Sequence, residues 1–101
     1  MNTRIISGKF HGNTKTYRSN DGHHDFIFNF VDRESYIDIY CTYRPSFNGK
    51  DPDPHKTHLW DSGLICIIKG KKPKSQSEAK RLAAQWAEYF LEYRKTGIAQ
   101  S

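Results

Sequence analysis

The residues with the clearest chemical potential lie close together in residues 55–68, His-Lys-Thr-His-Leu-Trp-Asp-Ser-Gly-Leu-Ile-Cys-Ile-Ile. Cys66 supplies a thiol that can act as a nucleophile. His58, eight residues earlier, supplies an imidazole that can act as a base or as a hydrogen-bond donor. A reactive cysteine needs partial exposure and a base or cation nearby. We therefore take Cys66 as a candidate nucleophile and His58 as its candidate partner in catalysis.

Cys66 also has a purely structural interpretation. It lies within an apolar run over residues 64–68, and a free cysteine in such a run is commonly a small buried hydrophobe. The turn at residues 61–63 instead places it near polar backbone and near His58. Exposure of the thiol therefore decides between a packed core residue and a nucleophile.

A run of basic residues follows the cysteine and is the strongest electrostatic feature of the chain. One interpretation is a solvated turn and helix start, which charged residues often cover. The other is a patch that binds phosphate or an acidic protein directly beside Cys66. The candidate partner-binding residues are Lys69, Lys71, Lys72 and Lys74, and the run continues with Lys80 and Arg81.

No metal or cofactor site is expected. His55 and His58 have a spacing that a metal could use on a helix, but the nearby prolines and the turn at Asp61 argue against a helix there. Cys41 and Cys66 do not form a paired ligand set. Glycine-rich phosphate loops and the Ser/His/Asp pattern of hydrolases are also absent from the sequence.

The first half of the chain has the alternation and turn signals of β-strands. We expect strands over residues 4–10, 25–31 and 36–43, with residues 14–18 returning as a short hairpin arm. One face of the strand at residues 25–31 carries Phe26, Phe28 and Phe30. On the strand at residues 36–43, Cys41 shares the apolar face with Ile37 and Ile39, so Cys41 is predicted to be a core residue.

The second half contains a loop and one long helix. Residues 44–54 include several prolines and Gly49, so no regular element is expected there. Ser75 and Glu78 have the spacing of a capping box, and Gly97 suits the C-terminal end of a helix. The apolar stripe between them consists of Ala79, Leu82, Ala83, Trp86, Phe90 and Tyr93. The order predicts an α+β fold, an antiparallel β-meander followed by an extended segment with the cysteine and a C-terminal helix packed on the sheet.

Length and charge bound the remaining possibilities. The 101 residues are expected to form a single domain over residues 1–101. A net charge of +5 and a pI of about 9.3 favour an acidic partner, either nucleic acid or a protein surface. Two cysteines are too few for a disulfide framework. Neither a signal peptide after Met1 nor a membrane span is recognised, so we expect a cytoplasmic protein without membrane contact.

The stretch from Pro54 to Cys66 resembles the active-site signature of ubiquitin-conjugating enzymes, in which a His-Pro-Asn segment precedes Gly-x-Ile-Cys-Leu. It is closer to the compact bacterial members of that superfamily, in which a histidine eight residues before the cysteine replaces the asparagine. The matching residues are His58, Gly63 and Cys66, followed on the helix by Trp86, Tyr89, Phe90, Thr96 and Gly97. The chain differs from eukaryotic members in opening on a strand instead of a helix.

The resemblance implies a reduced ubiquitin-conjugating-like (UBC-like) fold and a thioester on Cys66. The cysteine would accept a protein C-terminus and pass it to an amine, with His58 assisting. The turn at Asp61 and Gly63 would support the backbone and the oxyanion. Bacterial members of this type occur in antiphage defence operons, and the acyl donor would be a protein such as a neighbouring nucleotidyltransferase that makes cyclic oligonucleotides. The alternative is a small basic module without enzymatic activity, such as a phage-encoded inhibitor, that binds nucleic acid or an acidic protein.

Overall fold

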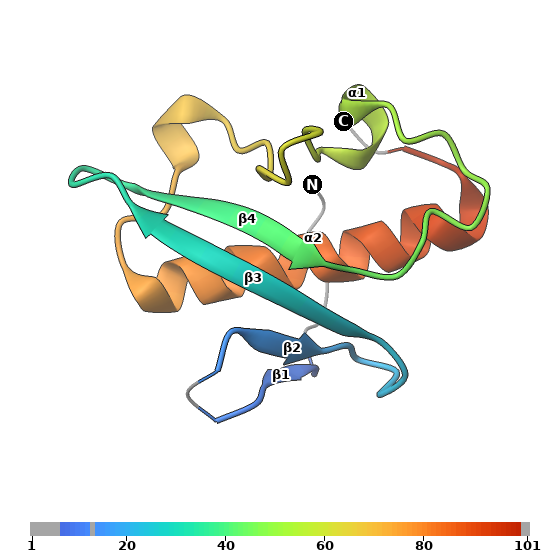
Figure 1. Cartoon of the computed structure of the whole chain (residues 1–101), viewed down its shortest axis with the longest axis horizontal. Coiled ribbons are helices and arrows are strands. Elements are labelled where there is room, and N and C mark those ends of the chain that lie inside the picture. Colours follow the sequence, from blue (N-terminus) through green and yellow to red (C-terminus); the bar gives the residue numbers. More distant parts are fainter. Residues whose placement is uncertain (1–6, 13, 100–101) are drawn as a thin grey trace.

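The computed structural model describes residues 7–12 and 14–99. Its elements in chain order are β1 (Lys9–Phe10), β2 (Thr16–Arg18), β3 (Asp25–Asp32), β4 (Ile37–Tyr43), α1 (Pro54–Thr57), the 3-10 helix η1 (Lys69–Lys71) and α2 (Gln76–Thr96). The fold is α+β, with a four-stranded antiparallel sheet and a C-terminal helix packed on it. Figure 1 shows α2 running behind β3 and β4, and the segment between α1 and η1 following the β4 side of the sheet.

The sheet is a meander in the order β1-β2-β3-β4, as the alternation and turns predict. The first strand is shorter than expected. Residues 4–6 of the predicted strand lie outside the described residues, and Ser7 and Gly8 do not join the sheet. Their backbone N–H groups donate instead to Oδ1 of Asn20, at 2.8 and 2.7 Å. A side-chain acceptor therefore replaces the strand partner at this point.

The core forms where β3 faces α2. Phe26 and Phe28 are buried on the inner face of the sheet, whereas Ile27 between them is 40% exposed. The ring of Phe26 meets the rings of Trp86 and Phe90 edge-on, with centroids 6.0 and 5.8 Å apart. This geometry is favoured for aromatic pairs. The predicted inner face of β3 is confirmed.

The ends of α2 are capped by side chains and by glycine. Oγ of Ser75 accepts from the backbone N–H of Glu78 at 3.2 Å, and Oε1 of Glu78 accepts from the backbone N–H of Lys74 at 2.8 Å. The reciprocal bond therefore lies one residue earlier than in the usual capping box. At the other end Gly97 has a φ of 73° and donates its N–H to the carbonyl of Tyr93.

The expectation that no helix forms around His55 and His58 is wrong. Residues Pro54–Thr57 make one helical turn, and His58 ends it with a φ of 55°. Proline stands at the first helical position, where its missing N–H breaks no bond, and Oδ1 of Asp53 accepts from the N–H of His55 at 3.0 Å. Pro54 therefore starts a helix here.

Candidate functional site

The candidate residues His58 and Cys66 are brought together by a small hairpin over residues 58–66. The backbone N–H of Cys66 donates to the carbonyl of His58 at 2.8 Å. Leu59 and Ile65 pair next to them, and the N–H of Trp60 donates to Leu64 at 2.9 Å. The eight-residue spacing in the sequence thus becomes direct pairing across two antiparallel arms.

The returning arm of this hairpin is fixed to the edge of β4. The N–H of Cys41 donates to the carbonyl of Gly63 at 2.8 Å, and the N–H of Ile65 donates to the carbonyl of Ile39 at 2.9 Å. Gly63 has a φ of 92°, and a Cβ at this position would lie 2.8 Å from the carbonyl oxygen of Cys41. Glycine is required for both reasons. Gly63 therefore allows the backbone of the hairpin to lie close to β4.

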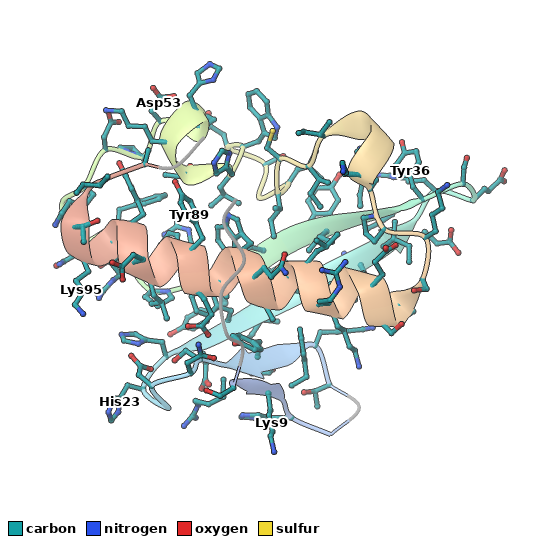
Figure 2. All side chains as sticks on the ribbon, turned by 180° about the vertical axis from the view of Figure 1, so that it is seen from behind. Lys9, His23, Tyr36, Asp53, Tyr89 and Lys95 are labelled. Carbon is teal, nitrogen blue, oxygen red and sulfur yellow. The ribbon has the colours of Figure 1, made fainter. Side chains whose placement is uncertain are left out.

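The preceding arm is held by aromatic side chains of α2. Trp86 donates its Nε1–H to the carbonyl of Thr57 at 3.0 Å, in the buried interior. The hydroxyl of Tyr89 donates to the carbonyl of Lys56, and the hydroxyl of Tyr93 donates to the carbonyl of Asp51 at 2.6 Å. Figure 2 shows Tyr89 reaching from α2 toward α1. These bonds fix the backbone that leads into His58.

Tyr89 also contacts His58 directly. The two ring centroids are 5.2 Å apart with the planes tilted by 49°. The apolar stripe predicted from the sequence does not include Tyr89, and it contains Trp86 and Tyr93 only as apolar residues. The signal that could have identified their role is their type, because tryptophan and tyrosine combine an apolar body with a donor that needs a partner when buried.

The thiol of Cys66 is exposed, which excludes the interpretation of Cys66 as a packed core residue. Its neighbour Ile65 is buried because the extended backbone turns alternate side chains to opposite sides. Cys41 is partly buried against the core, and its thiol donates to the carbonyl of Tyr43 at 3.3 Å. Burial raises the pKa of Cys41 to about 12. The two thiols therefore lie in opposite environments.

Cys66 and His58 line the same groove, which has a volume of about 670 Å³. The groove lies between the segment that carries the cysteine and the middle of α2, which contributes Leu82 and Gln85. Its outer walls include Trp60, 46% exposed, and Ile68, 76% exposed. Remaining lining residues are Pro54, His55, Ile65, Ile67 and Lys71. A mostly apolar wall with a thiol, imidazoles and an ammonium group suits an acyl group with an apolar neighbouring part.

The turn residues predicted to support the site face a different hollow. Asp61 and Gly63 line a second depression of about 680 Å³ together with Cys41 and Arg44. Trp60 lines both hollows. His58 and Cys66 therefore lie in one groove, whereas Asp61 and Gly63 line the other hollow and contribute to the turn of the hairpin.

The predicted basic patch divides in the same way. Lys71 lines the groove beside Cys66, and Lys74 is exposed. Lys72 is held by Asp38, with Nζ 2.9 Å from Oδ1, and Arg33 binds the other oxygen of Asp38 at 3.0 Å. The side chain of Lys69 lies outside the described part of the structure. Lys72 therefore has a structural role in joining the turn after η1 to the sheet.

Asp38 is the buried carboxylate of this cluster. Its burial alone would raise its pKa, but the hydrogen bonds and charges of Lys72 and Arg33 outweigh burial and hold the pKa below the ordinary value. Lys72 also sits 4.5 Å from the centroid of the Tyr36 ring. The cluster therefore joins β4 to the chain at Lys72, shortly before α2 begins.

Across residues 7–12 and 14–99, no group of three or more His, Cys, Asp or Glu side chains is arranged to hold a metal ion. In the same part of the chain, no helix has the length and apolar character needed to cross a membrane. Comparison of the chain with protein-family models, curated proteins and solved structures gives no match.

Proposed function

We propose that the chain is a cysteine-dependent acyl carrier and transferase with a reduced UBC-like fold. The observation that supports this most is the exposed thiol of Cys66, which is paired through the backbone with His58 and shares one groove with it. A thiol that serves only to fill the core would be buried, as Cys41 largely is. The single domain over residues 1–101 would carry the whole reaction.

The proposed reaction has two transfers. The Cys66 thiolate attacks the carbonyl carbon of an acyl thioester on a donor protein, the new C–S bond forms, and the donor thiol leaves as a thiolate that takes up a proton. An amine then attacks the Cys66 thioester. The C–N bond forms, the C–S bond breaks, and the proton lost by the amine balances the proton gained by the released Cys66. No cofactor takes part in either transfer.

His58 is proposed to assist these transfers from the wall of the groove. Its imidazole would donate a hydrogen bond to the oxyanion that develops on the carbonyl oxygen, or accept a proton from the incoming amine. The contact with Tyr89 limits the positions available to the ring. Asp61 and Gly63 would contribute by holding the hairpin in the conformation that presents Cys66.

The biological setting of the proposal rests on the sequence resemblance. We propose a protein C-terminus as the acyl group, with a nucleotidyltransferase that makes cyclic oligonucleotides as one candidate donor, in bacterial antiphage defence. The reaction would take place in the cytoplasm, where thiols remain reduced. The partner is a protein, and membrane contact is not part of the proposal.

The proposal is tested by intact mass under non-reducing conditions, with the protein co-expressed beside the products of neighbouring genes. We expect an adduct that dithiothreitol removes from the wild type, that is absent from Cys66→Ala and that resists dithiothreitol as an oxyester in Cys66→Ser. Cys41→Ser is the matched control and should still form the adduct. His58→Ala should slow transfer by about 100-fold with little change in melting temperature.

The second candidate is the basic binding module, which the exposed Lys71 and Lys74 and the exposed Trp60 and Ile68 favour. If Cys66→Ala keeps full biological activity and Lys71→Glu with Lys74→Glu abolishes it, the acyl carrier is wrong and the module is supported. Lys72 must stay unchanged in this test, because removing it leaves Asp38 without one of its cations. A steep fall of nucleic-acid affinity with salt would point the same way.

A further inference from the structure

The groove beside Cys66 combines apolar and cationic side chains, and the described residues that line it include no aspartate or glutamate. We propose that this groove selects the acyl donor by binding a C-terminal peptide segment that carries a bulky apolar side chain close to an acidic one. The inference deepens the proposed function and rests on it, because this segment is the part of the donor that leads to the acyl group. Its consequence is that donors are distinguished before the Cys66 thioester forms.

The apolar part of this selection comes from side chains that the fold leaves in contact with water. Trp60 and Ile68 are both exposed, and they line the groove together with the partly buried Leu82 of α2. Exposed apolar side chains that gather in one hollow mark a binding surface, whereas single ones are ordinary. A leucine side chain on the donor would remove this apolar surface from water, which favours binding.

The acidic part of the selection follows from charge complementarity. Lys71 is exposed in the groove lining, and no described side chain forms an ion pair or hydrogen bond with its ammonium group. The neighbouring acidic residues are placed elsewhere, since Asp53 caps α1 and Asp61 lines the other hollow. A donor carboxylate would therefore meet a cation and no competing anion, whereas a donor lysine would meet a like charge.

The turn at η1 joins the apolar and the cationic parts of the groove. The backbone N–H of Lys71 donates to the carbonyl of Ile68 at 2.8 Å, which closes a tight turn immediately after the apolar run. A turn of this kind brings residues three positions apart to the same side of the backbone. Both side chains line the groove. The matching apolar and acidic side chains should therefore be near neighbours in the donor sequence.

A set of synthetic donors tests this selection directly. Four short peptides end in the same glycine, carried as the thioester of mercaptoethanesulfonate, and differ only at the two preceding positions, where leucine or serine is followed by aspartate or lysine. Cys66 of the full-length protein takes the peptide and releases mercaptoethanesulfonate, and intact mass without reductant gives the loading rate. Exchange with glutathione gives the reactivity of each peptide alone. Relative to this reference, serine in place of leucine should lower the loading rate by about tenfold, and lysine in place of aspartate by about threefold at low ionic strength.

Matched variants assign the two preferences to the groove. Lys71→Glu should reverse the preference for aspartate over lysine, whereas Lys9→Glu, which changes the net charge equally at an exposed residue of β1 outside the groove, should keep it. Ile68→Ser should weaken the preference for leucine, and Ile98→Ser, at another exposed isoleucine outside the groove, should not.

The outcomes separate this inference from the proposed function. Loading rates that ignore either donor side chain, or control variants that change a preference as much as the groove variants do, overturn the inference and leave the acyl carrier standing. A protein that loads none of the peptides on Cys66 overturns both.

Discussion

The environments of the two cysteines are set by the direction in which each backbone points its side chains. Cys41 lies on the inner face of β4 beside Ile39 and is partly buried, so the proton on its thiol is hard to remove. Cys66 lies between two isoleucines but points outward, because the hairpin turns Ile65 inward. An apolar neighbourhood in the sequence therefore has different meanings at the two positions.

At the same scale, Gly63 holds the returning arm of the hairpin, which carries Cys66, against β4. We expect Gly63→Ala to lower the free energy of unfolding, because a side chain in backbone of this kind costs about 1–3 kcal/mol and its Cβ would also meet the Cys41 carbonyl at 2.8 Å. Gly49→Ala is the matched control, since Gly49 has a φ of 78° with no atom near its Cβ position. Urea unfolding of both variants isolates the effect of the close approach. Equal losses would show that the contact with β4 contributes nothing.

At the scale of elements, α2 both covers the sheet and holds the loop that enters the site. Trp86 and Phe90 on its inner side fill the core. The polar N–H and O–H groups of its aromatic side chains donate to the carbonyls of Asp51, Lys56 and Thr57. One helix thus joins the core to the candidate site. The hairpin over residues 58–66 is in turn fixed to β4, so the site is held both by α2 and by the sheet.

Tyr89 and Tyr93 make the same kind of bond, but the Tyr89 ring is the one that contacts His58. Each change to phenylalanine should lower the free energy of unfolding by about 1 kcal/mol, as expected for a lost hydrogen bond. Tyr89→Phe should in addition slow acyl transfer from Cys66 and alter its pH profile, because the position of His58 changes. The measurements are urea unfolding and transfer rates across pH 6 to 9. If Tyr93→Phe slows transfer equally, Tyr89 has no positioning role.

At the scale of the whole molecule, part of the positive charge is neutralised by ion pairs within the chain. Several cations form ion pairs within the chain: Arg18 binds Asp25, Arg33 and Lys72 bind Asp38, and Lys56 binds Asp51. The pKa of each of these carboxyls lies below its ordinary value. The count of 16 Lys and Arg side chains therefore overstates the number of cations available to a partner.

These ion pairs predict how stability depends on acid. The folded pKa of Asp38 is below the unfolded value of about 3.9, so the unfolded chain binds the proton first. The pair with Lys72 and Arg33 therefore contributes stability above that pH and loses it as the pH falls through the folded value. Asp38→Asn should cost about 2 kcal/mol at pH 7 and progressively less as the pH falls below about 4, as measured by urea unfolding. Asp51→Asn, at an exposed pair, should change little at either pH. A constant difference for Asp38→Asn would contradict the pairing.

The sequence by itself determined the approximate positions of β2, β3 and β4, the inner face of β3, the ends of α2 and the α+β class, because alternation, turn residues and caps act over a few neighbouring residues. It also identified His58 and Cys66 as the residues to examine. It does not predict α1, because proline usually breaks a helix, whereas Pro54 stands at the first position of this one. Only the tertiary structure decided that Cys66 is exposed, that Lys72 is bound to Asp38 and that Tyr89 contacts His58. Those facts depend on which segments pack together across the chain, and local residue patterns do not encode such contacts one by one.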